Sequence, residues 1–324
     1  ATSQCVWILP MPGPQAVATR YSMSDRRRLW KAAIKWRMYS VAVMPVLLAA
    51  GWRLGAQESV RWSQFSGFLL AAVLLLLWEN LSNDLFDADT GVDVVGKPHS
   101  IVALVGQRRS VRRWACLALM LGLGLMLILA LRSSFVVLPL VLVSCGLGYL
   151  YQGPPFRLAY RGWGEPICWL AFGPFATAAA LLVLAPSDQA AVPWQLALML
   201  GSGPALATSL VLFCSHFHQV DEDAAHGKRS PVVRLGTAKA ASLVPWFVAG
   251  TLALEWVPVL HGDWPLTALF GAIGLPAAAA LIRLLRDHHA EPDRIAGSKF
   301  LALRFQALNG LGLSAGLALG PLLS

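Results

Sequence analysis

Residues 64–93 read QFSGFLLAAVLLLLWENLSNDLFDADTGVD, and this segment is the most informative part of the chain. Its first part, residues 64–82, is a mostly apolar run of about the length that an α-helix needs to cross a bilayer. Its second part carries four aspartates, Asp84, Asp87, Asp89 and Asp93. The segment therefore predicts a transmembrane helix with a carboxylate cluster at one end.

The rest of the chain repeats this membrane pattern. Of its 324 residues, 56% are hydrophobic and 13% are charged, whereas an ordinary soluble domain carries about 25% charged residues. We place apolar spans at residues 38–56, 64–82, 114–131, 133–151, 166–185, 195–215, 239–258, 265–285 and 300–323. The sequence predicts an all-α membrane protein with nine transmembrane helices, and its composition disfavours a soluble enzyme.

The basic residues are divided unevenly between the two sides of these spans. With nine spans, 23 of the 26 lysines and arginines fall on the side of the N-terminus, and the opposite side holds only Arg53, Arg61 and Arg132. This asymmetry orients a protein with its basic side toward the stroma or cytoplasm. Because the basic residues lie in short loops between spans, we expect no nucleic-acid partner.

The chain begins with a segment of different composition. Residues 1–24 contain no acidic residue, and residue 1 is Ala. Two interpretations stay open for residues 1–28, the remnant of an organelle transit peptide and a tail without fixed structure. We expect the membrane domain to cover residues 29–324.

The first acidic cluster has the spacing of one helix face. Asn80, Asp84 and Asp87 are related by i, i+4 and i+7, and Asn83 joins this face through Asp87. Gly91 can end the helix, so that Asp93 folds back toward the cluster. Carboxylates this close repel one another, and a divalent cation removes the repulsion. An all-oxygen ligand set favours Mg²⁺ or Ca²⁺ over zinc.

A second acidic cluster follows the sixth span, on the same side of the membrane. In residues 216–230, HFHQVDEDAAHGKRS, Gln219 and Asp223 share a helix face, with Asp221 and Glu222 between them. His216 and His218 are two residues apart and point in different directions on a helix, which disfavours zinc. Each cluster leads into Gly-Lys, at Lys97 and at Lys228-Arg229. Two oxygen-ligand sites beside these cations predict a pocket for a diphosphate.

Two other interpretations of these clusters stay open. A single acidic cluster at a helix end is usually a solvated cap or loop. Carboxylates in a membrane protein also mark cation and proton pathways, so a cation transporter is the main alternative from another class. Transporter sites usually lie near the bilayer midplane, whereas both clusters here lie at helix ends beside basic loops. The positions therefore favour a diphosphate-binding enzyme.

Several local motifs carry a resemblance to a known family. The two clusters resemble the Asp-rich motifs of the UbiA superfamily of intramembrane prenyltransferases. The finer strings resemble the branch that acts on 1,4-dihydroxy-2-naphthoate. They are Asn80–Asp84, Tyr151–Arg157, Gly164–Pro166, Phe213–Asp221, Gly227–Pro231 and Val233–Thr237. The resemblance covers residues 29–324 and implies nine helices around a central cavity that opens laterally to lipid.

The resemblance also implies an activity. A phytyl or related polyprenyl diphosphate would prenylate 1,4-dihydroxy-2-naphthoate, with loss of CO₂ and diphosphate, on the way to phylloquinone or menaquinone. The cofactor would be Mg²⁺. The location would be a plastid membrane or, alternatively, a cyanobacterial one, with the active-site loops on the stromal or cytoplasmic side. A relative that prenylates homogentisate or 4-hydroxybenzoate is the alternative within the family.

The implied site residues fall into three groups. The metal ligands are Asn83, Asp84, Asp87, Gln219, Asp221 and Asp223; many relatives carry an acid where this chain has Gln219. The substrate-binding residues are Asn80, Lys97, Arg157, His216, His218, Lys228 and Arg229. The catalytic residues are Asp84 and Asp87, together with Asp93, Asp221 and Glu165 as candidates for a general base.

Overall fold

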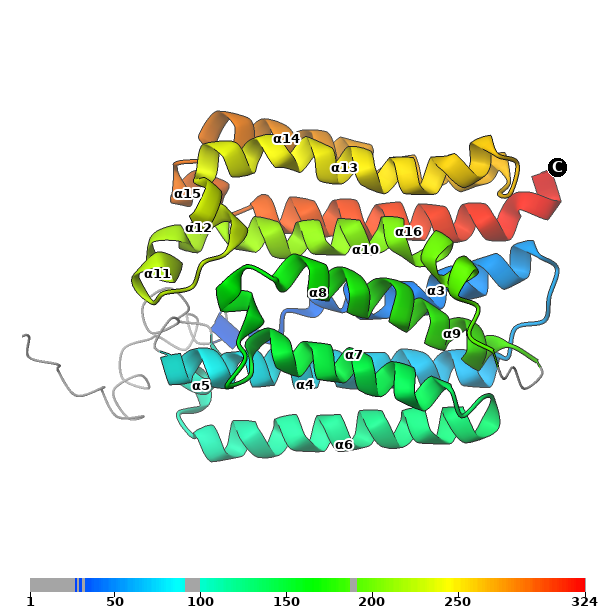
Figure 1. Cartoon of the computed structure of the whole chain (residues 1–324), viewed down its shortest axis with the longest axis horizontal. Coiled ribbons are helices and arrows are strands. Elements are labelled where there is room, and N and C mark those ends of the chain that lie inside the picture. Colours follow the sequence, from blue (N-terminus) through cyan, green and yellow to red (C-terminus); the bar gives the residue numbers. More distant parts are fainter. Residues whose placement is uncertain (1–26, 28, 31–32, 91–99, 187–190, 324) are drawn as a thin grey trace, which may run out of the picture.

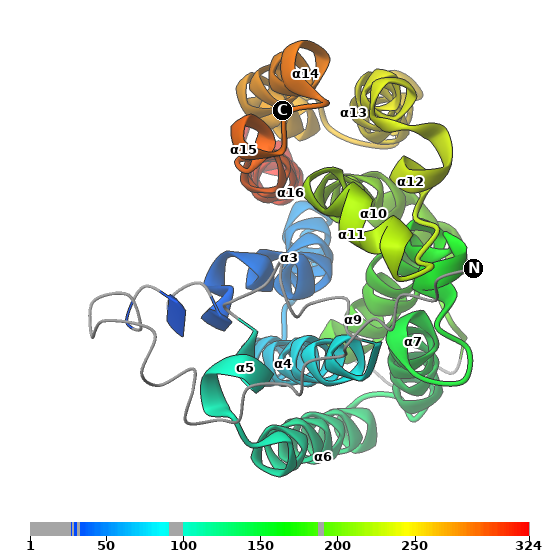
Figure 2. The same cartoon turned by 90° about the vertical axis from the view of Figure 1, so that its left-hand side faces the viewer.

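The computed structural model describes residues 27, 29–30, 33–90, 100–186 and 191–323, and every regular element in these ranges is helical. The long helices are α3 (Tyr39–Gly55), α4 (Trp62–Thr90), α6 (Arg108–Arg132), α7 (Val137–Gln152), α10 (Trp194–Ser215), α13 (Thr237–Leu260), α14 (Leu275–His288) and α16 (Ser298–Leu323). They run side by side along the long axis of the molecule (Figure 1). Figure 2 shows them end-on, in two groups joined through α3 and α10.

The fold confirms the predicted all-helical membrane class but not the number of spans. Among the described residues, seven helices are long and apolar enough to cross a membrane, and α7 is a shorter apolar helix of 16 residues. At about 1.5 Å per residue, α7 is shorter than the roughly 30 Å hydrocarbon core. The predicted span at 300–323 forms α16, which carries Arg304, Gln306 and Asn309 and is not one of the seven. The nine-span count is therefore not confirmed.

Helix α4 is longer than its apolar run. It covers 29 residues and continues through the acidic segment to Thr90, because no proline or glycine interrupts residues 68–90. At about 1.5 Å per residue the helix is roughly 44 Å long, which exceeds the hydrocarbon core. Its last turns therefore carry Asp84, Asp87 and Asp89 toward one end of the bundle.

The span predicted at 166–185 is divided. It forms α8 (Gly164–Leu170), a π-helical turn η3 (Ala171–Phe175) and α9 (Ala176–Leu184). Pro174 lies in the π turn and has no N–H to donate, which explains the wider local geometry. Such turns are common beside functional sites.

The short helices gather at one end of the bundle. Figure 1 shows α5 (Ile101–Val105), α11 (Val220–Ala225), α12 (Pro231–Leu235) and α15 (Pro292–Ile295) at the end opposite the C-terminus. Both acidic clusters therefore lie at the same end, as their alternation along the chain predicts. The 3-10 turns η1 (Trp36–Met38), η2 (Leu158–Arg161) and η4 (Phe217–Gln219) accompany them, and η5 (Leu266–Gly274) precedes α14.

Candidate active site

A cavity of about 620 Å³ lies inside the bundle. Side chains from η1, α3, α4, α6, α7, α8, η3, α9, α10 and α16 line it. Its deeper wall is apolar, with Phe68, Leu76, Met126, Val141 and Phe172, and its other part is lined by amides, carboxylates and lysines. A mostly apolar pocket with a few convergent polar groups is the usual form of a small-molecule site.

Helix α4 contributes one polar wall of the cavity. Asn80, Asn83 and Asp87 all line it. Asp87 is buried, and the Gln152 side-chain amide of α7 donates a hydrogen bond to its carboxylate. The side-chain oxygen Oδ1 of Asn83 and the side-chain nitrogen Nδ2 of Asn80 are buried without a hydrogen-bond partner among the described residues. Unsatisfied buried amides are costly, so this wall is built to contact a polar ligand.

Asp84 faces a different direction from Asp87. It does not line the cavity; its carboxylate is 3.2 Å from Nζ of Lys35 and accepts a hydrogen bond of 3.0 Å from the backbone N–H of Ile101. Ile101 begins α5, so Asp84 ties this short helix to α4. The structure therefore divides the predicted face, with Asn80 and Asp87 toward the cavity and Asp84 toward Lys35.

The end of α10 and the segment after it supply the opposite wall. His216, His218, Gln219 and Lys228 line the cavity. Gly227 has a φ of +74°, a conformation that favours glycine, and it turns the chain back after α11. Lys228 Nζ consequently lies 3.2 Å from the carboxylate of Asp223.

A buried charged network stands behind this wall. Asp223 is 0% exposed, and its second oxygen is 3.4 Å from Nδ1 of His216. Nε2 of His216 is 3.6 Å from the buried carboxylate of Glu165 on α8. Asp223 and Glu165 do not line the cavity themselves. In this structure they position His216 and Lys228, which do.

The remaining predicted site residues lie away from the cavity or outside the description. Asp221 and Arg229 are exposed and do not line it. The Arg157 guanidinium lies 5.9 Å from the ring centroid of Tyr160 and does not line the cavity either. Asp93 and Lys97 lie outside the described residues.

Tyr160 connects the two acidic regions near the cavity mouth. Its hydroxyl is 2.6 Å from the Thr90 hydroxyl at the end of α4, and Nζ of Lys228 lies 5.9 Å from its ring centroid. Burial raises the pKa of Tyr160 to about 12, and the hydrogen bond with Thr90 opposes this shift. Tyr160 therefore stays protonated at neutral pH.

The raised pKa of Tyr160 predicts a pH dependence of stability. An unfolded tyrosine ionises near pH 10, whereas Tyr160 in the folded protein ionises near 12. The unfolded state therefore loses its proton first, and stability falls as the pH rises from about 10 to 12. We expect Tyr160→Phe to show a smaller loss of melting temperature between pH 9 and pH 11 than the wild type, measured in detergent. An equal loss in both proteins would contradict this assignment.

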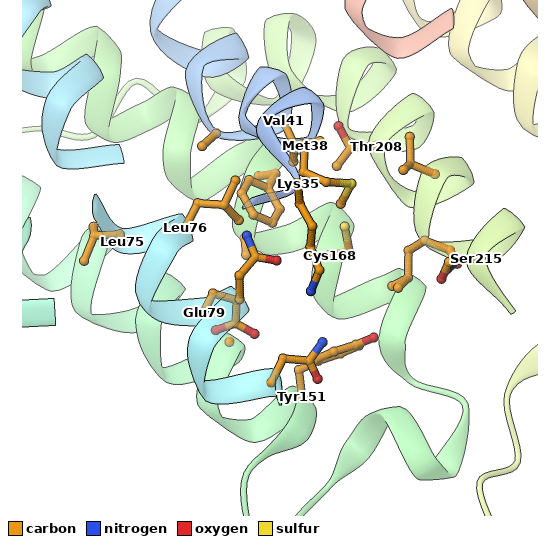
Figure 3. A pocket seen from close by; sticks show the side chains of 18 of the residues that line it. Lys35, Met38, Val41, Leu75, Leu76, Glu79, Tyr151, Cys168, Thr208 and Ser215 are labelled. Atoms are coloured by element: carbon orange, nitrogen blue, oxygen red, sulfur yellow. Dashed lines mark hydrogen bonds between the residues drawn. The ribbon is translucent and has the colours of Figure 1, made fainter. Parts of the chain in front are cut away.

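The sequence analysis assigned no role to several polar residues of the cavity, among them Lys35, Glu79, Tyr151, Gln152 and Lys299. The only signal for Glu79 was its position one helical turn before Asn83, and Tyr151 and Gln152 lay within a quoted motif without an assigned role. Lys35 and Lys299 come from opposite ends of the chain, so no local pattern could place them here. Figure 3 shows Lys35, Glu79 and Tyr151 projecting toward the same space.

The cavity wall fits a Mg²⁺ ion that is held partly by protein and partly by water and substrate phosphates. Within the described part of the chain, no three His, Cys, Asp or Glu side chains converge on a metal position, so an all-protein cage is absent there. Mg²⁺ is more often held by one or two carboxylates, waters and substrate phosphates. The Asp87 carboxylate and the unsatisfied Asn83 oxygen on the cavity wall match this second mode.

Two curated relatives align with most of this chain. It is 40% identical over 291 residues to a 2-carboxy-1,4-naphthoquinone phytyltransferase of Synechocystis, covering 90% of this chain and 93% of that protein. It is also 40% identical over 295 residues to the chloroplastic 2-carboxy-1,4-naphthoquinone phytyltransferase of Arabidopsis thaliana, covering 90% and 77%. A 1,4-dihydroxy-2-naphthoate octaprenyltransferase of Mycobacterium tuberculosis is 28% identical.

Solved structures agree at the level of the fold. A digeranylgeranylglyceryl phosphate synthase structure matches 91% of this chain and 99% of its own with a TM-score of 0.53 and 15% identity. A UbiA homologue from Archaeoglobus fulgidus, bound to DMAPP and Mg²⁺, matches 87% and 97% with the same TM-score. The UbiA prenyltransferase family model matches residues 42–308, which include both walls of the cavity. With this match and two relatives at 40% identity, the chain belongs to the UbiA prenyltransferase family.

Proposed function

We propose that this protein transfers a phytyl or related polyprenyl group to 1,4-dihydroxy-2-naphthoate. The observation that carries the proposal is the cavity, whose wall of carboxylate, amides and lysine borders an apolar interior. Two naphthoquinone phytyltransferases at 40% identity support the choice of substrates. The acceptor in the names of these two relatives is the quinone, which is the two-electron oxidised form of the dihydroxynaphthoate. Only the reduced ring is electron-rich enough to act as a carbon nucleophile.

The polar part of the cavity is suited to bind the diphosphate. Lys228 lines the cavity as a buried cation whose position is fixed by Asp223, and it can donate to phosphate oxygens. Asp87 and Asn83, and Gln219 from the opposite wall, would hold Mg²⁺ against the same phosphates. A bound Mg²⁺ would stabilise the negative charge of the departing diphosphate. Asp84, Asp221 and Asp223 do not line the cavity and would have to turn toward it to act as ligands.

The apolar interior is suited to hold the isoprenoid chain. Phe68, Leu76, Met126 and Phe172 line it, and the π turn η3 brings Phe172 to the wall. These side chains would exclude water from the first carbon of the donor. The allylic cation would therefore react with the aromatic ring and not with water. The acceptor ring would lie between this interior and the diphosphate site.

The reaction balances without an oxidant. The ring carbon forms a bond to the first carbon of the prenyl group, and the carbon–oxygen bond to diphosphate breaks with its electron pair on diphosphate. The ring carboxylate then leaves as CO₂ and its electron pair restores the aromatic ring. The product is a 2-prenyl-1,4-naphthoquinol, which oxidises to the naphthoquinone precursor of phylloquinone or menaquinone in a separate step.

We place the protein in a plastid or cyanobacterial membrane as part of the same proposal. It is an integral membrane protein by its apolar helices, and its two 40% relatives are cyanobacterial and chloroplastic. The excess of lysine and arginine on one side supports a stromal or cytoplasmic location for the end with both acidic clusters. Residues 29–324 would form one prenyltransferase domain.

Product analysis tests the proposal directly. Purified protein in lipid vesicles is incubated with Mg²⁺ and phytyl diphosphate, together with 1,4-dihydroxy-2-naphthoate or homogentisate. We expect mass spectrometry to detect a prenylated naphthoquinone with the first acceptor and no product with the second. Prenylated homogentisate alone, or cation flux across the vesicles without any product, would overturn the proposal.

A further inference from the structure

Glu79 extends the polar wall of α4 one turn deeper into the membrane. It precedes Asn83 by four residues and Asp87 by eight, so the three lie along one side of the helix, about 6 Å apart per step. All three line the cavity. Glu79 therefore lies between the proposed diphosphate site and the apolar interior, at the depth where the two substrates must meet.

Among the residues that the structure describes, the carboxyl group of Glu79 has no polar partner. In residues 33–90, 100–186 and 191–323, no group forms a hydrogen bond or ion pair with it. Leu75, Leu76 and Cys145 line the cavity around it. A carboxyl group at this depth is expensive, and such groups are usually functional. Figure 3 shows Glu79 projecting from α4 toward the space that Tyr151 also faces.

Helix α7 holds this carboxyl group in place. A Cβ atom on Gly148 would lie 2.6 Å from Oε2 of Glu79, so the carboxyl group occupies the space that a side chain would fill. Gly146 lies two residues earlier, on nearly the opposite side of the same helix, and has no atom within 4 Å of the corresponding position. The absence of a side chain at residue 148 therefore makes room for a defined orientation of Glu79.

We propose that Glu79 is a catalytic residue that binds one ring hydroxyl of the aromatic acceptor and takes its proton during prenyl transfer. This inference rests on the proposed function. The prenyl chain offers no hydrogen-bond donor and the diphosphate offers acceptors, so a carboxylate at this depth matches only the hydroxyls of the acceptor. The apolar surroundings strengthen this hydrogen bond.

The proton follows a closed path. As the ring carbon bonds to the prenyl group and diphosphate leaves with its electron pair, the hydroxyl proton passes to a Glu79 oxygen and the ring oxygen becomes a carbonyl. Loss of CO₂ then returns an electron pair to the ring. The ring oxygen takes the proton back from Glu79, which is regenerated as the carboxylate. No other reactant is needed.

Kinetics of Glu79→Gln in lipid vesicles test the proton transfer. We expect kcat to fall about 100-fold, as for loss of a general base, while the KM for phytyl diphosphate changes less than about twofold. Glu255→Gln is the matched control, because Glu255 is a buried glutamate outside the cavity whose carboxylate accepts a hydrogen bond of 2.8 Å from Asn309. It should keep wild-type turnover.

Acceptor analogues test the hydroxyl contact. The competitive inhibition constants of 1-hydroxy-2-naphthoate and 4-hydroxy-2-naphthoate are measured for the wild type and for Glu79→Leu. Loss of a hydrogen bond to a charged group should raise the constant about 10- to 100-fold for the analogue that keeps the contacted hydroxyl. The analogue that lacks this hydroxyl should bind both proteins equally. Equal shifts for both analogues would assign Glu79 to structure and overturn the inference.

The glycine pair tests the placement independently. Gly148→Ala should displace the Glu79 carboxylate and lower kcat about 10-fold, whereas Gly146→Ala should leave kcat unchanged. Equal turnover in these two variants would contradict the placement.

Failure of the inference is distinguishable from failure of the proposed function. An active wild type with an equally active Glu79→Gln overturns only the inference. A wild type that makes no prenylated naphthoquinone overturns the proposed function.

Discussion

Replacement of Asp87 by asparagine is expected to lower the rate of prenyl transfer about 100- to 1000-fold, the usual loss when one electrostatic group is removed from a preorganised site. Asp87 is the buried carboxylate that faces the cavity from α4, beside the unsatisfied oxygen of Asn83. The amide keeps the shape of the side chain and can still accept the hydrogen bond from Gln152. The helix bundle should therefore fold normally while the negative charge is lost.

The measurement is the initial rate at saturating phytyl diphosphate across a range of Mg²⁺ concentrations, with melting temperature as a check on folding. Asp89→Asn is the matched control, because Asp89 lies two residues away on the same helix, is exposed and pairs with Arg108. It should retain more than about half of the activity, since an exposed ion pair contributes little. Normal turnover in Asp87→Asn would remove Asp87 from the proposed metal site.

Replacement of Lys228 by methionine is expected to reduce both stability and donor binding. Asp223 is 0% exposed, and Lys228 Nζ lies 3.2 Å from its carboxylate. Removal of one partner of a buried ion pair leaves an uncompensated charge and costs about 3–5 kcal/mol. The same change removes the cation that lines the cavity, so the KM for phytyl diphosphate should rise more than the KM for the aromatic acceptor.

A second substitution separates these two effects. In the double variant Asp223→Asn/Lys228→Met the buried charge is gone, so we expect most of the lost melting temperature to return while the KM for the donor stays high. Lys239→Met, at an exposed position on α13, should change neither quantity. If the double variant regains donor binding as well, Lys228 acts only through the fold and does not contact the diphosphate.

The amino-acid sequence by itself determined the membrane class and the family, and it predicted that both acidic clusters lie at the same end of the bundle. Long apolar blocks are typical of membrane-spanning helices, and the uneven distribution of lysine and arginine predicts on which side of the membrane each loop lies. The segment from Asn80 to Asp87 and the segment from His216 to Lys228 needed no tertiary information to be recognised as polar clusters at helix ends. The count of nine spans was not confirmed, because α7 is short and α16 is interrupted by polar residues.

Only the tertiary structure decided which of these polar side chains face one another. Successive helical residues are turned by about 100°, so the direction of each carboxylate depends on how its helix is rotated against its neighbours. Asp87 faces the cavity while Asp84 turns to Lys35, a residue 49 positions earlier. Asp223 is buried behind Lys228 while Asp221 is exposed. Glu79 lay outside every predicted cluster, and packing against Gly148 of α7 orients it. Contacts between segments that are distant in the sequence determine these side-chain directions. The spacing of residues within one helix cannot predict such contacts.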